Sequence, residues 1–249
     1  MSRAYIGTSG WSYREWRGGF YPPGTAAGDY LARYAERFPS VEVNATAYGL
    51  PLRTTVERWC AAVPAGFAFA VKAPHRLTHF HRLRQCAADL QDLATAIKPF
   101  GVHLGPLLFQ LPPSLKVDAP LLGGFLAEAR ATLGSQPLVC EFRHPSWYCD
   151  EVFAVLHGAG AACCVHDMPG STIAEPPFAG LLYLRRHGTM GRYRGSYGRD
   201  RLQADARLIA AAVAAGAPAF AYFNNTADGA AIEDVRTLLD LVSCADTAP

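Results

Sequence analysis

The segment Leu138-Val139-Cys140-Glu141-Phe142-Arg143 shows the pattern that decides the fold. Successive side chains of a β-strand point to opposite faces, so the apolar residues at 138, 140 and 142 share one face. Glu141 and Arg143 share the other face. A buried carboxylate must be paired, because an unpaired buried charge is strongly destabilising. We therefore expect the apolar face to pack against helices and the charged pair to face the axis of a barrel.

Short apolar segments of this kind alternate along the chain with amphipathic, helix-like segments. Strands are expected at residues 5–8, 41–44, 67–72, 107–110, 138–142, 162–166, 181–185 and 219–223. Helices are expected at residues 30–38, 54–63, 87–100, 120–133, 151–158, 201–215 and 231–242. Such alternation is typical of parallel βαβ units. We count eight units, which predicts an α/β fold of the (β/α)8 TIM-like barrel class, and 249 residues is a usual length for that class.

The chain shows no internal boundary. No segment rich in proline, glycine or serine divides it, so we expect one barrel domain over residues 1–249. An open, doubly wound sheet is the alternative fold. The first turn, Gly7-Thr8-Ser9-Gly10-Trp11, lacks the G-x-G-x-x-G pattern by which many such sheets bind dinucleotides, so the closed barrel is preferred.

Composition excludes several classes of protein. Half of the residues are hydrophobic and 18% are charged, which is too apolar for a disordered chain. No apolar run reaches the roughly 18 residues of a membrane span, and no signal sequence precedes the first strand, so we expect a cytoplasmic protein with no membrane partner. The seven cysteines lack C-x-x-C spacing, which favours neither disulfides nor a zinc site. A net charge of +2 is too small to attract nucleic acid by itself. The oligomeric state is not predicted.

Polar residues gather where the predicted strands end, and the active sites of barrels lie at these C-terminal ends. Titratable groups at such a rim suit acid/base catalysis, and the catalytic candidates are Glu141, His144, Asp167 and His187. Cations, amides and a phenol are the candidates for substrate binding: Asn44, Lys72, Gln110, Arg143, Arg185, Arg192, Tyr193, Asn224 and Asn225. The alternative is that Glu141, Arg143 and Lys72 form a layer of ion pairs that only fills the barrel.

The segment 187–199 is rich in glycine, arginine and tyrosine. Loops after the seventh and eighth strands often bind phosphate in barrels, because glycines let backbone N–H groups approach an anion and arginines grip it. A solvated loop with no ligand is the alternative. A second aromatic segment contains Trp11, Tyr13, Trp16, Phe20 and Tyr21. We expect it to pack in the core, and stacking against bases or sugars is its alternative use.

No metal site is predicted, and the cofactor is unknown. Two groups could offer divalent-metal ligands, but neither is favoured. The first is His75, His79 and His81, which have no carboxylate nearby in sequence. The second, better group is Glu141, His144, His166, Asp167 and His187.

The chain resembles the YecE-like family, a domain of unknown function (number seventy-two) that is described as a barrel. Seven ordered motifs carry the resemblance: Gly7-Thr8-Ser9-Gly10-Trp11 with Phe20-Tyr21-Pro22, Val41-Glu42-Val43-Asn44-Ala45-Thr46-Ala47-Tyr48, Lys72 with Thr78-His79, Phe109-Gln110-Leu111-Pro112-Pro113, Glu141-Phe142-Arg143-His144-Pro145-Ser146-Trp147 followed by Asp167, Tyr183-Leu184-Arg185-Arg186-His187-Gly188, and Phe223-Asn224-Asn225. Ala47 departs from the family, which usually has phenylalanine there. The resemblance implies a shared site formed by Asn44, Lys72, Glu141, Arg143, His144, Asp167, Arg185, His187 and Asn224. It implies no reaction.

These patterns favour an enzyme of the hydrolase, lyase or isomerase type that acts by acid/base chemistry on a phosphorylated or otherwise anionic small molecule. In this hypothesis Arg185, Arg192 and Lys72 hold the anion, and Arg143 orients Glu141. Either Glu141 or Asp167 is the base, and either His144 or His187 is the acid. Asn44, Gln110 and Asn224 bind substrate hydroxyls. The alternatives are a nucleic-acid-binding protein or phosphodiesterase that uses the arginine and aromatic loops, and a scaffold without catalysis.

Overall fold

The computed structural model describes residues 3–172, 180–191 and 193–245. Its strands form one parallel sheet in the order β6-β5-β4-β3-β2-β1-β9-β8-β7. The strands are β1 Ala4–Ser9, β2 Ser40–Val43, β3 Ala68–Lys72, β4 Leu104–Gln110, β5 Leu138–Glu141, β6 Ala161–Cys163, β7 Val165–His166, β8 Leu182–Arg186 and β9 Ala219–Phe223. Neighbours in sequence are therefore neighbours in space.

The sheet closes on itself at its sixth strand. The predicted strand 162–166 is present as two halves, β6 and β7, which Cys164 alone separates. The first half pairs with β5 and the second half pairs with β8. The two edges of the sheet are thus consecutive segments of one strand. The predicted eight-fold α/β barrel is confirmed, with this division of its sixth strand and a register shift between β3 and β4 near Phe69 and Val71.

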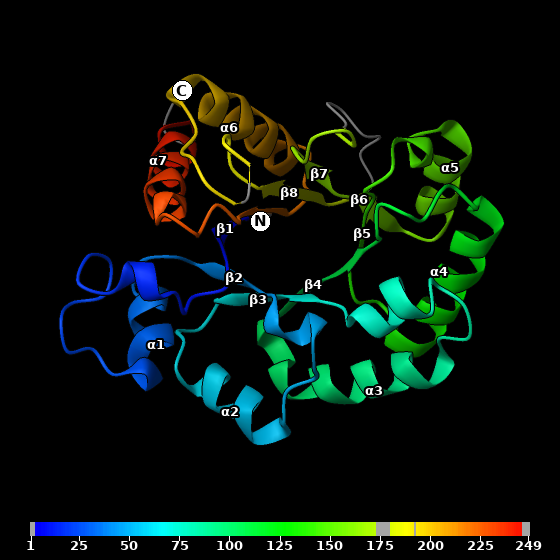
Figure 1. Ribbon diagram of the computed structural model, residues 1–249, viewed down its shortest axis with the longest axis horizontal. Coiled ribbons are helices and arrows are strands. Elements are labelled where there is room, and N and C mark those ends of the chain that lie inside the picture. The colour runs from blue at the N-terminus through cyan, green and yellow to red at the C-terminus, as the bar shows by residue number, and fades with distance from the viewer. Residues whose placement is uncertain (1–2, 173–179, 192, 246–249) are drawn as a thin grey trace.

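Helices surround the strands on the outside of the barrel (Figure 1). They are α1 Tyr30–Ala35, α2 Arg53–Ala61, α3 Ala87–Ile97, α4 Ala119–Leu133, α5 Asp150–Gly158, α6 Arg199–Ala214 and α7 Ala230–Ala245. The short helical turns are η1 Arg14–Trp16, η2 Ala27–Asp29, η3 Ala45–Ala47, η4 Arg76–Phe80, η5 Lys98–His103 and η6 Pro145–Trp147. Between β7 and β8 the described residues 167–172 and 180–181 contain no helix, so an eighth helix is not among the described elements.

The local sequence explains where helix α4 begins. The Asp118 carboxylate accepts a hydrogen bond from the backbone N–H of Leu121 at 3.0 Å, and Pro120 occupies the first turn of α4. An aspartate cap satisfies one of the free N–H groups of a helix start, and proline fits there because it has no N–H to satisfy.

Two separate apolar cores confirm the predicted alternation of side chains. The larger core lies between strands and helices and includes Leu138, Cys140 and Phe142. The smaller core fills the barrel interior and contains Ala68, Ala70, Leu108, Val139, Ala162, Cys164, Leu181, Tyr183, Phe220 and Tyr222. On three strands the residue two positions beyond a member of the inner core is charged, as Lys72, Glu141 and Arg185. The interior of the barrel is therefore apolar along most of the strands and charged at their C-terminal ends.

The aromatic segment after β1 packs in the core, as expected. Trp16 and Tyr21 are buried, and the Trp16 ring lies parallel to that of Tyr34. The hydroxyl of Tyr34 accepts from the N–H of Thr8 at 2.8 Å and donates to the carbonyl of Ser40 at 3.0 Å. This close packing requires a glycine at position 7, because a Cβ there would lie 1.9 Å from the Ser40 carbonyl oxygen.

No helix within the described residues is long and apolar enough to cross a membrane.

Candidate functional site

The Arg185 guanidinium is the centre of the charged layer in the barrel. Its Nε and Nη2 donate to the two oxygens of Glu42, at 2.9 and 2.7 Å. Its Nη1 donates to Oε2 of Glu141 at 2.6 Å. Arg185 is 1% exposed, and both carboxylates are fully buried. All three nitrogens of the guanidinium are thus bonded to carboxylates, so Arg185 holds the site together and is not free to grip a ligand.

The Glu42 carboxylate is saturated by its surroundings. The Ser9 hydroxyl donates to Oε1 at 2.6 Å and the Tyr183 hydroxyl donates to Oε2 at 2.7 Å. Burial would raise the pKa of Glu42, but Arg185 and these hydrogen bonds hold the pKa below its ordinary value. Glu42 is therefore an ionised anchor for Arg185. The sequence prediction did not include Glu42 in the site, although its position between Val41 and Val43 is the signal for it.

Glu141 joins Arg185 to the mouth of the barrel. Its Oε1 lies 2.5 Å from Nη2 of Arg143, and Nε2 of His187 lies 3.5 Å from the same oxygen. Burial opposes ionisation, but Arg185 and Arg143 hold the pKa of Glu141 well below its ordinary value. A carboxylate between two guanidiniums is a poor proton acceptor at neutral pH.

His187 is neutral at neutral pH. Burial, Arg185 and Arg143 lower its pKa to about 4, against the opposing effect of Glu141. Nη2 of Arg143 lies 3.2 Å from Nε2, and a guanidinium can only donate, so Nε2 accepts this hydrogen bond. Nδ1 lies 3.2 Å from Nδ2 of Asn224. The ring of Tyr193 lies 5.9 Å away, which places this half-exposed tyrosine beside the mouth.

Lys72 ends β3 and differs from the arginines in having no carboxylate of its own. Within the described part of the chain, its ammonium group has no ion pair or hydrogen bond, and the side chain is only partly exposed. Burial and the neighbouring Arg185 lower the pKa of Lys72 to about 8. Its amine is therefore the cation of this site whose charge can change near neutral pH.

His166 has a structural role. Its Nε2 lies 2.7 Å from the Phe142 carbonyl oxygen, which can only accept, so the ring proton is on Nε2. Its Nδ1 accepts from the N–H of Met168 at 3.2 Å. Both ring nitrogens are thus used in the neutral form, and burial lowers the pKa of His166. The side chain links β7 to the residue that follows β5.

A divalent metal does not fit the residues that could hold one. Among the described residues, the one group with suitable spacing is Glu141, His166 and His187, whose ligand atoms lie within 4.8 Å of one another. Both ring nitrogens of His166 are engaged with the backbone, and two guanidiniums already neutralise Glu141. A cation would have to displace these arginines.

The remaining predicted residues fall into two groups. Asn44 follows β2, and Gln110 lies beside Glu141 in the register of β4 and β5, so both are at the mouth. Oδ1 of Asn44 is buried without a hydrogen-bond partner among the described residues. The other group serves loop structure: Asp167, His144 and Asn225. Arg192 lies outside the described residues.

Each residue of the second group binds backbone. Asp167 accepts from the N–H of His187 at 2.8 Å and from the Tyr197 hydroxyl. His144 accepts from the N–H of Ser146 at 3.2 Å and so caps η6. Asn225 donates to the Gly195 carbonyl at 2.9 Å, which ties the glycine-rich loop to the end of β9.

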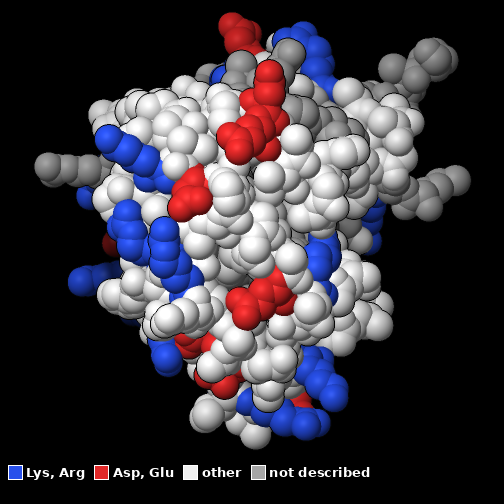
Figure 2. Space-filling view, turned by 90° about the vertical axis from the view of Figure 1, so that its right-hand side faces the viewer, with Lys and Arg blue, Asp and Glu red and all other residues white. Residues whose placement is uncertain are grey.

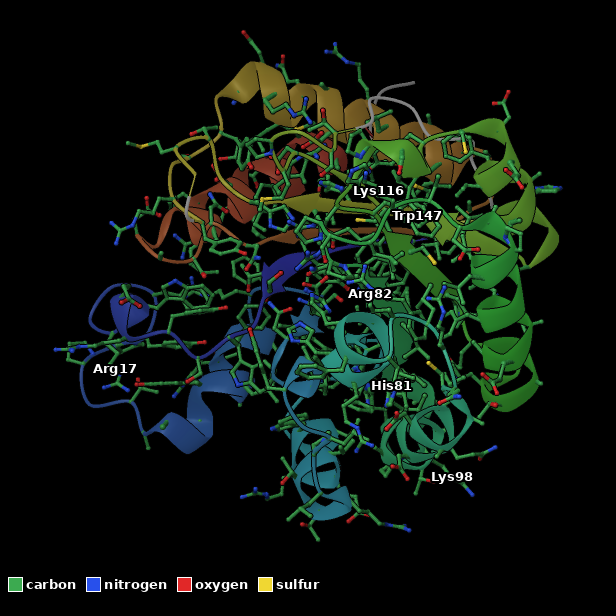
Figure 3. All side chains as sticks on the ribbon, turned by 45° about the vertical axis from the view of Figure 1, so that its right-hand side comes forward. Arg17, His81, Arg82, Lys98, Lys116 and Trp147 are labelled. Carbon is green, nitrogen blue, oxygen red and sulfur yellow. The ribbon has the colours of Figure 1, made fainter. Side chains whose placement is uncertain are left out.

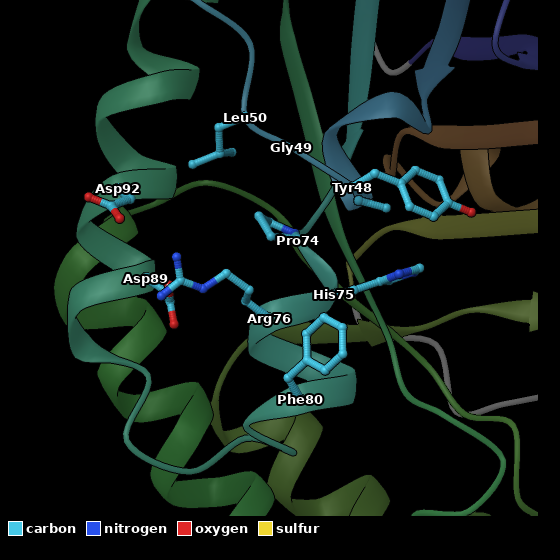
Figure 4. Close-up of a pocket in the computed structure, with 10 residues that line it drawn as sticks. Tyr48, Gly49, Leu50, Pro74, His75, Arg76, Phe80, Asp89 and Asp92 are labelled. Carbon is cyan, nitrogen blue, oxygen red and sulfur yellow. The ribbon is translucent and has the colours of Figure 1, made fainter.

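Two cavities lie among the loops and helical turns that follow the strands. One, of about 550 Å³, is lined by His166, Asp167, glycines of the loop 188–198 and Arg201. The other, of about 500 Å³, lies between η3, η4 and α3. Figure 4 shows its walls, with Arg76 beside Asp89 on one side and the exposed rings of Tyr48 and Phe80 on the other. His75 lines this cavity and contacts His79, with the two rings tilted by 40° and their centres 4.1 Å apart.

These features define an α/β-barrel protein with a candidate site at the C-terminal ends of its strands. The chain belongs to the family described as "Protein of unknown function DUF72", whose model matches residues 5–249. The resemblance to the YecE-like family is thereby confirmed.

Individual relatives agree with this assignment. The UPF0759 protein YunF of Bacillus subtilis is 30% identical over 150 residues, which span 58% of this chain and about half (52%) of that relative. A DUF72 family protein of Thermotoga maritima has a TM-score of 0.80 at 25% identity, covering 97% of this chain and 99% of its own. A D-psicose 3-epimerase of Clostridium cellulolyticum, solved with D-tagatose, has a TM-score of 0.61 at 12% identity, covering 96% and 98%, and this likeness concerns the fold alone.

Proposed function

We propose that this protein is an enzyme that binds a small anionic molecule, such as a phosphorylated or carboxylated compound, in the mouth of the barrel and acts on it by acid/base chemistry. One observation carries the proposal: three cations, Arg143, Arg185 and Lys72, face two buried carboxylates, Glu42 and Glu141. The layer therefore has one positive charge in excess. Such a charge in a partly enclosed site attracts an anion.

Arg143 is the residue that binds the anion. Its side chain is 9% exposed, one Nη2 edge contacts Glu141, and its Nε is buried without a hydrogen-bond partner among the described residues. Guanidinium groups bind carboxylate and phosphate in a two-point fashion. The neutral His187 and the titratable Lys72 are the groups that exchange protons with the ligand, and Asn44, Gln110 and Asn224 bind its hydroxyls.

The nucleic-acid alternative has less support. Trp16 and Tyr21 of the aromatic segment are buried, so they cannot stack on bases. The face drawn in Figure 2 carries basic and acidic side chains intermixed, whereas nucleic-acid-binding surfaces concentrate positive charge.

A thermal-shift experiment tests the proposal with phosphate, ribose 5-phosphate and pyruvate as probes. We expect at least one of these anions to stabilise the wild-type protein, since a ligand at about 100 times its dissociation constant adds roughly 2.7 kcal/mol. Arg143→Ala should lose this stabilisation while remaining folded, because Glu141 keeps its bond to Arg185. Arg53→Ala, at an exposed ion pair on α2, is the matched control and should respond like the wild type. Equal stabilisation of all three proteins would show that the anion binds elsewhere.

A further inference from the structure

Lys72 occupies a fixed position at the mouth of the barrel. It is the last residue of β3, and its carbonyl accepts a hydrogen bond from the Thr46 hydroxyl at 2.6 Å. The alternation along β3 places Ala68 and Ala70 in the inner core, so the side chain of Lys72 points inward above them. The rigid end of β3 thus places the amine in the same charged layer as Glu141 and Arg143, close enough for both to act on its charge.

The amine is not a member of the ion-pair network. Glu42 and Glu141 lie in the same layer, but Arg185 and Arg143 already supply their cationic partners. When Lys72 loses its proton, both buried carboxylates keep their cations. Deprotonation therefore does not leave a buried charge unpaired, which is the usual obstacle to a neutral lysine near acidic residues.

Every element around Lys72 contributes charged or titratable groups that act on it. They are Glu42 from β2, His75 and His79 from the η4 region, Glu141 and Arg143 from β5 and its end, and Arg185 from β8. Burial and the two guanidiniums outweigh the two carboxylates, so the pKa falls to about 8. An amine that is desolvated beside other cations is an activated nucleophile.

We propose that Lys72 forms an imine with the substrate, which is then an anionic carbonyl compound. This inference rests on the proposed function, because the anionic group of the substrate is the one that Arg143 binds. A carboxylate or phosphate on Arg143 would bring a carbonyl carbon of the same molecule toward the amine. The acid/base chemistry of the site would then act on a substrate whose carbonyl has become a cationic electron sink.

The step balances with one proton taken from solvent. The neutral amine attacks the carbonyl carbon, a C–N bond forms, and the carbonyl oxygen takes up the proton that the nitrogen gives away. The carbinolamine then loses its hydroxyl group as water after a second proton transfer to that oxygen. The C–O bond breaks, and the nitrogen lone pair completes the protonated imine. Neither oxidant nor reductant is consumed.

The small number of lysines makes it simple to assign each adduct to its residue. The chain has three lysines, and Lys98 and Lys116 are exposed on the outside of the protein, where Figure 3 shows them well apart. The full chain is incubated at pH 7.5 with sodium cyanoborohydride and either glyoxylate, an anionic aldehyde, or glycolaldehyde, its uncharged counterpart. Peptide mass spectrometry then measures the adduct on each lysine. Lys72→Arg, which keeps the charge but cannot form an imine, and Arg143→Ala are treated in parallel.

We expect glyoxylate to label Lys72 at least about tenfold faster than Lys98 or Lys116, because at neutral pH an amine of pKa about 8 holds far more neutral form than an ordinary lysine of pKa about 10.4. The rate at Lys72 should rise with pH to a plateau above about 8. Arg143→Ala should slow glyoxylate labelling more than glycolaldehyde labelling, because both aldehydes lose the effect of Arg143 on the pKa of Lys72 and only glyoxylate also loses its anion site.

The outcomes separate the two proposals. Adducts spread over the exposed lysines, with Lys72 unlabelled, would overturn the imine even if anions still stabilise the protein through Arg143. Selective labelling of Lys72 that does not depend on Arg143 would support the nucleophile and count against the anion site. Circular dichroism of each variant ensures that the comparison concerns folded protein.

Discussion

Arg185 and Arg186 are neighbours on β8, yet they serve opposite faces of the barrel. Arg185 points inward and binds Glu42 and Glu141. Arg186 points outward and makes a two-point ion pair with Asp205 of α6, at 2.7 and 2.5 Å. Both arginines are 1% exposed. The outer carboxylate has one further cation beside it, the half-exposed Arg201 at 3.7 Å, whereas the inner network continues through Glu141 to Arg143 and the mouth.

The difference shows how one strand can carry both structure and a site. Asp205 binds Arg186 through both of its oxygens, and the second cation beside it, Arg201, is 49% exposed to solvent, so this pair fastens α6 to the sheet. The inner layer has more cations than carboxylates and is open at one end, so it can take up an anion. Burial and ion pairing alone therefore do not distinguish a structural arginine from a functional network, but the place of the excess cation does, because Arg201 is half exposed to solvent and Arg143 is only 9% exposed.

Removing the inner arginine should have the largest effect. Arg185→Met leaves two buried carboxylates without their central cation, and breaking a single buried pair already costs about 3–5 kcal/mol. We expect a loss of about 5 kcal/mol or more, which is comparable to the whole stability of many domains. Urea unfolding followed by circular dichroism measures it. A loss below about 1 kcal/mol would mean that the two carboxylates find other partners.

Removing the outer arginine should be severe but repairable. Arg186→Met should lower the free energy of unfolding by about 3–5 kcal/mol, because Asp205 stays buried and charged. Adding Asp205→Leu should restore most of this loss, since a hydrophobic pair can replace an isolated buried ion pair. The exposed pair of Arg53 and Glu57 is the control, and Arg53→Ala should change stability by about 0.5 kcal/mol or less. If the double variant were as unstable as Arg186→Met alone, the loss could not be assigned to the buried charge of Asp205.

Lys72 should give the smallest effect, and one that depends on pH. Its pKa of about 8 in the folded protein lies below the ordinary value of about 10.4, so the unfolded chain binds more protons between these two pH values. The stability of the wild type relative to that of Lys72→Met should therefore rise as the pH increases from 8 to 10.4. Lys72→Met lacks this titration and should be more stable than the wild type below pH 8, by about 2 kcal/mol once the partial exposure of Lys72 is considered. Parallel stability curves for the two proteins between pH 7 and 10.4 would show that Lys72 titrates normally.

The fold was predictable because its signals are local. Strands were located by apolar residues at alternate positions, and helices by the amphipathic spacing of apolar residues. Both sets of bounds were correct to within a few residues. The division of the sixth strand was not predictable, since Ala161 to Val165 is a continuous apolar run that gives no sign of changing partners at Cys164.

The site was predictable in part for the same reason. Alternation placed Glu141 and Arg143 inward, which the structure confirms. The partners of Arg185 lie far away in sequence, with Glu42 separated from it by 143 positions, and no local pattern reports such a contact. Asp167 and Asn225 showed the opposite difficulty, because a polar residue at a strand end looks the same whether it meets a ligand or the backbone of a loop.

The sixth strand is divided into β6, which pairs with β5, and β7, which pairs with β8. The interruption of the β-ladder at this division is the seam of the barrel. Elsewhere the ring is closed by backbone hydrogen bonds, which do not titrate, but at the top of this seam the imidazole of His166 bridges β7 to the carbonyl of Phe142. Because burial lowers the pKa of His166, the folded protein favours its neutral form, and the stability that this form provides is lost as the pH falls below the ordinary histidine value of about 6.5. In acid the barrel should thus begin to open between its fifth and sixth strands, where the His166 side chain provides the contact.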